Sequence, residues 1–134
     1  MTTSRCVFAG FKNQSELPPY YTCLDMFVLP SRFDPWGLVL NEAMLFGVPV
    51  VASTGVGAGL DLIQDGKNGY VFEVGDVDAL TGALRSLVRS AATQRQFGAC
   101  SQAIVQRYSY DECVGGILAA LRHVTRRSRV GRRN

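Results

Sequence analysis

The stretch that decides the fold is residues 30–44, which read PSRFDPWGLVLNEAM. An apolar run at residues 26–29 leads into this stretch, and a turn containing Pro35 and Gly37 lies in its middle. The apolar spacing after the turn predicts a helix over residues 38–46. A strand, a glycine turn and a helix start together make a place where an α/β protein could bind a phosphate group.

The rest of the sequence continues this alternation of strands and helices. Short apolar strands are predicted at residues 6–9, 26–29, 49–53 and 70–72. Helices are predicted at residues 17–24 (capped by Ser15), 38–46, 60–64, from 76 onward, at 93–108 and after 111. Such alternation is typical of an α/β fold with a parallel sheet. We therefore predict a Rossmann-like parallel sheet with flanking helices, with too few strands for a complete doubly wound domain.

Charge is spread unevenly over the 134 residues, whose formal net charge is +3. Six of the fourteen basic residues are arginines near the C-terminus: Arg122, Arg126, Arg127, Arg129, Arg132 and Arg133. Without them, eight basic groups stand against eleven acidic ones, so the charge does not indicate nucleic-acid binding. Residues 122–134 are predicted to be a basic, disordered tail. The alternative is weak contact of this tail with an anionic membrane surface.

The cysteines and the single histidine do not suggest a metal site. None of the four cysteines has CxxC spacing with another, and the only histidine is His123. Scattered cysteines in a sequence without a signal peptide suggest free thiols in a reducing compartment. We expect a cytoplasmic protein, with the inner face of the membrane as the alternative for its basic tail.

Four residues around the turn are candidates for binding a ligand. The first free N–H groups of the predicted helix belong to Gly37 and Leu38, where the helix dipole favours an anion. Arg32 is either a phosphate contact or a surface residue. Gly37 either lets a ligand approach the backbone or only permits the turn. Asp34 either hydrogen-bonds a sugar hydroxyl or serves the turn before Pro35.

Glu42 stands out because its helix is nearly apolar all round, which predicts burial of that helix. A buried carboxylate is costly unless it has partners. It lies about one turn into the helix, where it could accept hydrogen bonds from ligand hydroxyls such as those of a ribose. The alternative is a carboxylate that reaches solvent beside Asn41.

Residues 30–44, followed by GVPVVAS at residues 47–53, resemble the donor-site signature of retaining glycosyltransferases of the GT-B fold. The resemblance is to the group 1 class, also called family four. Smaller pieces agree in the same order: GF at residues 10–11, ELP at 16–18, Asp25 before a strand, and DGKNG at 65–69.

The resemblance implies roles for the two acidic residues, which seven residues separate. The family pattern has two glutamates, and the first is replaced here by Asp34. By resemblance, Asp34 is the catalytic carboxylate that meets the donor sugar, and Glu42 binds the nucleotide ribose. Gly37 and Leu38 would offer backbone N–H groups to the sugar-phosphate region, with Arg32 as a further donor contact. The implied donor substrate is a nucleotide-diphosphate sugar, and neither a metal nor a cofactor is implied.

The resemblance also implies an organisation in two domains. Residues 1–121 are expected to be a partial nucleotide-sugar-binding domain, an incomplete half of the GT-B C-terminal domain. The implied partner is an N-terminal acceptor domain, which this sequence does not contain. We expect transfer of a sugar to an acceptor hydroxyl with retention, and we expect this chain to be inactive alone. The alternative is a non-catalytic fragment that only binds nucleotide sugars.

A rival reading comes from residues 55–59, which read GVGAG after a predicted strand. The pattern is similar to a dinucleotide fingerprint, so an NAD-binding Rossmann domain is the competing hypothesis. However, the third glycine of that fingerprint would fall at Leu60. A bend that lines the donor cleft is the other interpretation of these glycines.

Overall fold

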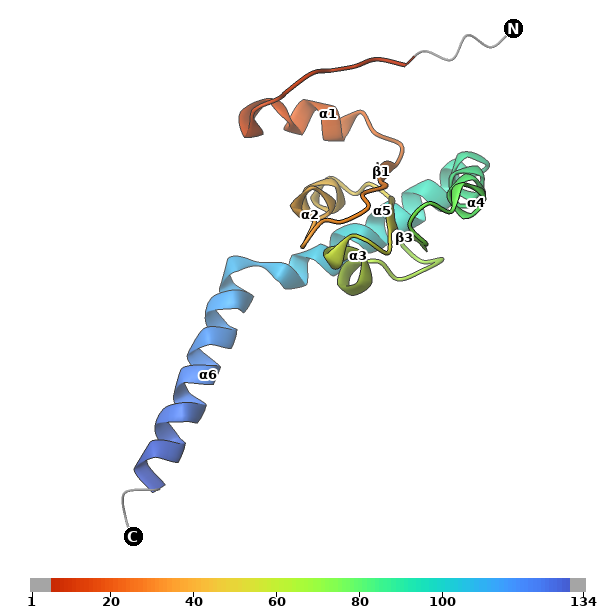
Figure 1. Ribbon diagram of the computed structural model, residues 1–134. Helices are drawn as coiled ribbons and strands as arrows, with labels where there is room; N and C mark the ends of the chain where they lie inside the picture. The colour runs from red at the N-terminus through yellow and green to blue at the C-terminus, as the bar shows by residue number, and fades with distance from the viewer. Residues whose placement is uncertain (1–5, 131–134) are drawn as a thin grey trace, which may run out of the picture.

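Three parallel strands form the centre of the protein in the computed structural model, which describes residues 6–130, with side chains described for residues 6–125. The strands are β1 (Phe27–Leu29), β2 (Val50–Ser53) and β3 (Gly69–Phe72), and they lie side by side in chain order. Val28 pairs with Val51, which pairs with Tyr70. The predicted parallel sheet with flanking helices is therefore confirmed (Figure 1).

Helices connect and follow the strands. In chain order the helical elements are η1 (Gln14–Glu16), α1 (Pro18–Thr22), α2 (Leu38–Leu45), α3 (Gly57–Leu62), α4 (Val77–Val88), α5 (Ala91–Val105), η2 (Gln106–Tyr108) and α6 (Tyr110–Val130). Gly47, at φ +70°, follows the C-cap Phe46 and ends the helix that was predicted over residues 38–46. The Asp76 side chain accepts a hydrogen bond from the Ala79 N–H and so caps α4.

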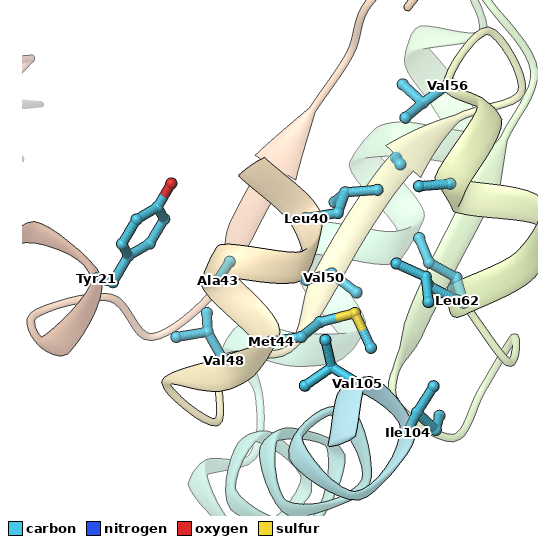
Figure 2. Close-up of a cluster of buried hydrophobic side chains, with 13 residues drawn as sticks. Tyr21, Leu40, Ala43, Met44, Val48, Val50, Val56, Leu62, Ile104 and Val105 are labelled. Atoms are coloured by element: carbon cyan, nitrogen blue, oxygen red, sulfur yellow. The ribbon is translucent and has the colours of Figure 1, made fainter. Parts of the chain in front are cut away.

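The core has two parts, one on each face of the sheet. Val50 and Ala52 belong to one buried cluster and Val51 to the other, as expected from side chains that alternate along a strand. The larger cluster holds Leu40 and Met44 of α2 together with residues of α1, α3 and α5 (Figure 2). The smaller cluster packs α4 and part of α5 on the opposite face.

The N-terminal part of the chain differs from the prediction. Residues 6–9 form no strand, and Val7 and Phe8 are 83% and 93% exposed. Residues 6–9 have no neighbouring strand with which to form backbone hydrogen bonds, so their apolar composition was not sufficient to make them a strand. The helix predicted at residues 17–24 is found as α1, but it ends at Thr22, and its N-cap is Leu17 rather than Ser15, which lies in η1.

Helix α6 leaves its apolar side chains in solvent, since Val114, Ile117, Leu118 and Leu121 are 46–57% exposed. Its extent also differs from the prediction. Residues 122–130 are helical rather than disordered, and residues 131–134 lie outside the described part of the chain. The helix points away from the sheet (Figure 1). Over the residues that the structure describes, no helix has both the length and the apolar character that crossing a bilayer requires.

Candidate donor site

The turn after β1 is tied by backbone hydrogen bonds to the loop after β2. The Asp34 N–H donates to the Gly55 carbonyl oxygen at 2.8 Å, and the Gly57 N–H donates to the Asp34 carbonyl oxygen at 3.1 Å. A third bond runs from the Ala58 N–H to the Trp36 carbonyl oxygen at 2.7 Å. Both loops follow the carboxyl ends of parallel strands, which is where open α/β sheets bind ligands. We call residues 31–37 and 54–58 together the loop junction.

Gly37 is buried in the loop junction and precedes α2 with φ +86°. A Cβ at this position would lie 2.6 Å from Cγ1 of Val56, so only glycine fits the local backbone and packing. The turn-permitting role of this glycine is therefore confirmed. The backbone N–H groups of Gly37 and Leu38 donate to no group among the described residues.

Asp34 serves the turn, as one of the two alternatives proposed. Its Oδ1 atom accepts a hydrogen bond from the Trp36 N–H at 3.2 Å. The Trp36 indole N–H in turn donates to Oδ1 of Asn41 at 3.0 Å, which links the turn to α2. Asp34 is half-buried, and its other carboxylate oxygen makes no hydrogen bond with a described residue. One oxygen therefore holds the turn and the other is free to meet a ligand.

Glu42 has a partner that the sequence reasoning missed. Its Oε2 atom accepts a hydrogen bond from the Tyr21 hydroxyl at 2.7 Å. Burial raises the pKa of the Tyr21 hydroxyl well above its usual range, and the hydrogen bond to Glu42 and the charge of Glu42 add to this. Tyr21 was not among the predicted site residues, and the signal that could have indicated a partner is that a half-buried acid needs a hydrogen-bond donor.

The predicted burial of α2 on all sides is wrong. Leu40, Ala43 and Met44 are buried, whereas Leu38 and Leu45 are 58% and 53% exposed. One side of α2 packs on the larger buried cluster, and its other side is exposed to solvent. Apolar residues on both sides of the helix were therefore not a sign that both sides are buried.

The five predicted site residues do not share one cavity. Asp34 lies close to Gly37, since the Asp34 Cγ atom is 3.8 Å from where a Gly37 Cβ would be. Glu42 lines a cavity of about 180 Å³ together with Tyr21 of α1. Arg32 is exposed and lines a different cavity, beside Asp76 before α4. The structure thus joins Asp34 and Gly37 and leaves Arg32 apart from Glu42.

The glycines at residues 55–59 serve packing between loops rather than a dinucleotide fingerprint. A Cβ at Gly55 would lie 2.7 Å from the Ser31 carbonyl oxygen, and one at Gly57 would overlap the Pro35 carbonyl group. Gly57 and Gly59 lie inside α3 rather than in a loop. The backbone of residues 31–35 therefore lies directly against Gly55 and Gly57. Within residues 6–130, no group of three or more His, Cys, Asp and Glu side chains could hold a metal ion.

A family model described as glycosyl transferases group 1 matches residues 2–103 of this sequence. The chain belongs to the group 1 glycosyl transferase family. Among curated members, the sulfoquinovosyl transferase SQD2 of Arabidopsis thaliana is 36% identical over 107 residues, which are 78% of this chain and 21% of SQD2. The mannosyltransferase LpsB of Rhizobium meliloti is 40% identical over 81 residues, 59% of this chain and 22% of LpsB. This group 1 chain thus spans about a fifth of the length of these relatives.

Solved structures agree with the family assignment. A sucrose-phosphate synthase from Thermosynechococcus elongatus superposes with a TM-score of 0.75 at 28% identity, covering 91% of this chain and 30% of the synthase. HepE of Anabaena, solved with UDP and glucose, gives a TM-score of 0.77 at 28% identity, covering 90% of this chain and 33% of HepE. The GT-B fold class and the group 1 resemblance predicted for this glycosyl transferase family member are confirmed.

Proposed function

We propose that this chain supplies the donor side of a nucleotide-sugar site in a retaining glycosyltransferase. The reaction would move a sugar from a nucleotide-diphosphate sugar to an acceptor hydroxyl with retained anomeric configuration. One observation carries the proposal: in a group 1 chain, the free N–H groups of Gly37 and Leu38 lie between two half-buried carboxylates, Asp34 and Glu42, along residues 34–42.

The start of α2 is assigned to the diphosphate. The N–H groups of Gly37 and Leu38 have no acceptor within the described chain, and a helix start carries partial positive charge. Charge builds up on the leaving phosphate as the bond to the sugar breaks. Fixed N–H donors lower the barrier because they stabilise that charge without having to reorganise. The loop junction provides the rigidity that this requires.

Asp34 is assigned to the donor sugar. One of its oxygens is held by the Trp36 N–H, so the position of the carboxylate is fixed by the turn. Its free oxygen can accept a hydrogen bond from a sugar hydroxyl or stabilise the positive charge that develops at the anomeric carbon. Glu42 is assigned to the ribose hydroxyls, for which a carboxylate with one free oxygen is a suitable acceptor. Arg32 is assigned to the phosphates as an exposed cation.

The acceptor side of the reaction is also a proposal. Because the chain spans about a fifth of its curated relatives, we propose that an acceptor domain is needed and that residues 6–130 alone do not turn over a nucleotide sugar. HepE was solved with UDP and glucose, so UDP is the first nucleotide to test. A cytoplasmic location and contact of the arginine-rich end with a membrane stay predictions.

Calorimetric titration of the chain with UDP, GDP, ADP and NAD tests the donor assignment. We expect one nucleoside diphosphate to bind, and we expect a Glu42→Ala variant to bind it at least about tenfold more weakly, as loss of a hydrogen bond to a charged group implies. Binding of NAD in preference to all three diphosphates, or no binding of any diphosphate, would contradict the proposal.

Turnover tests the second part. Incubation of the chain with UDP-glucose and simple hydroxyl acceptors should release no UDP above the level of the Glu42→Ala variant. UDP release by the wild-type chain that is lost in Glu42→Ala would show that these residues suffice for the reaction, and would overturn the need for an acceptor domain.

A further inference from the structure

We propose that Tyr21 is a positioning residue for the donor nucleotide: its hydroxyl fixes one oxygen of Glu42 so that the other oxygen is presented to a ribose hydroxyl. The inference deepens the proposed function and rests on it, because it concerns the same donor site. Tyr21 itself would not touch the nucleotide.

The Tyr21 ring is held firmly enough to act as an anchor. Its side chain is 6% exposed. The ring stacks on Phe46 at a centroid distance of 5.5 Å and lies 6.1 Å from Phe27 at a tilted angle. Figure 2 shows the ring at the edge of the buried cluster, on the side nearest α2. A ring packed against the end of α2 and against β1 keeps its hydroxyl in one place.

The hydrogen bond occupies only half of the carboxylate. The Tyr21 hydroxyl donates to Oε2 of Glu42 at 2.7 Å, and Oε1 makes no hydrogen bond with any described residue. Glu42 is half-buried, so its free oxygen is not shut away from ligands. A glutamate side chain has several rotatable bonds and would otherwise sample several orientations. The tyrosine removes that freedom before the nucleotide arrives, which lowers the entropic cost of binding.

The direction of the hydrogen bond follows from the protonation states. A phenol carries its proton at neutral pH, and burial beside Glu42 raises the pKa of Tyr21 further, so the Tyr21 hydroxyl donates and Oε2 of Glu42 accepts. The other side-chain oxygen of Glu42 can accept a hydrogen bond from a ribose hydroxyl, which is a donor.

The adjacent tyrosine gives a matched control. Tyr20 belongs to the same helix, but its side chain is 44% exposed and its ring faces Lys12 Nζ, 5.7 Å from the ring centroid. It makes no hydrogen bond to Glu42. Like Tyr21→Phe, a Tyr20→Phe substitution removes one hydroxyl from α1, but it leaves the hydrogen bond between Tyr21 and Glu42 in place.

The experiment compares UDP with 2′,3′-dideoxy-UDP, which lacks the ribose hydroxyls, in calorimetric titrations of five chains. These are the wild type, Tyr21→Phe, Tyr20→Phe, Glu42→Gln and the double variant with Tyr21→Phe and Glu42→Gln. We expect Tyr21→Phe to weaken UDP binding about fivefold, the size of one hydrogen bond, and to leave dideoxy-UDP binding unchanged. Tyr20→Phe should change neither. In a Glu42→Gln background, adding Tyr21→Phe should weaken UDP binding no further.

A structural role for Tyr21 would give a different pattern. If Tyr21→Phe weakens both nucleotides equally, or weakens neither while the wild type binds UDP, the inference is overturned and the proposed donor site stands. If the additional loss from Tyr21→Phe is the same in the Glu42→Gln background, the effect does not act through Glu42 and the inference is also overturned. If the wild type binds no nucleoside diphosphate at all, the proposed function itself fails.

Discussion

The two carboxylates of the candidate site are held in different ways. Asp34 sits in the loop junction, where three backbone hydrogen bonds and close glycine packing fix its position. Glu42 is held by a single side-chain hydrogen bond from a helix 21 residues earlier in the sequence. A backbone junction admits few substitutions, whereas a side-chain pair can be changed without unfolding the chain. The half of the site around Asp34 therefore depends on the backbone of the fold. The half around Glu42 depends on a side-chain pair that can be substituted without changing the backbone.

Within the candidate site, the largest effect is expected at the loop junction. Gly37→Ala should lower the free energy of unfolding by about 2–4 kcal/mol, because alanine at positive φ is strained and its Cβ would overlap Val56. Urea denaturation measures this. Gly66→Ala is the control, since Gly66 also has a positive φ, +71°, but has nothing within 4 Å of its Cβ position. Equal losses in the two variants would mean that the junction packing contributes nothing.

A smaller effect is expected at the side-chain pair that Tyr21 and Glu42 form. Tyr21→Phe should lower the free energy of unfolding by about 1–2 kcal/mol, because it removes a hydrogen bond to a charged group and keeps the ring packing. The same denaturation series with Tyr20→Phe should show a change of less than about 0.5 kcal/mol, as for an exposed side chain. A loss as large as that of Gly37→Ala would remove the distinction between the two halves of the site.

The same pair predicts a dependence on alkaline pH. The folded state raises the pKa of Tyr21 above the value of about 10 of an unfolded tyrosine. Above about pH 10 the unfolded chain loses this proton while the folded chain still keeps it. The contribution of the Tyr21 hydroxyl to the free energy of unfolding is therefore complete below about pH 10 and falls as the pH rises further. The urea denaturation midpoint should fall more between pH 8 and pH 10.5 for the wild type than for Tyr21→Phe. An identical drop in both would contradict the shift.

The smallest effect is expected on α6, which lies outside both halves of the site. Leu118→Ala should change the free energy of unfolding by less than about 0.5 kcal/mol, because this side chain is 46% exposed. Leu40→Ala on α2 is the contrasting variant, since that side chain is fully buried and its loss should cost about 2–5 kcal/mol. A loss at Leu118 that approaches the loss at Leu40 would show that α6 packs in solution.

The sequence predicted the features that depend on neighbouring residues. The apolar strand at residues 49–53, the helix that begins near residue 76 and the helix over residues 38–46 each depend on local chemistry, and each is confirmed. The turn at Asp34 and Gly37 belongs to the same class, because proline, aspartate and glycine set backbone angles directly.

The features that sequence reasoning missed depend on contacts between distant segments. Gly55 and Gly57 resembled a fingerprint, yet their small size is required by the backbone of residues 31–35. The Tyr21 partner of Glu42 was not visible, since nothing in either segment reports that α1 packs beside α2. Residues 6–9 have the composition of a strand but no neighbour to pair with, and only the fold reveals that.

The most direct test of the central claim is a map of amide chemical shifts of the ¹⁵N-labelled chain during titration with UDP. If the start of α2 and Glu42 bind the donor, the shifts will be concentrated at the amides of Gly37, Leu38 and Glu42 and will be small on α6. Shifts confined to the amides of residues 55–59 or to α6, or the absence of any shift at saturating UDP, would contradict the claim.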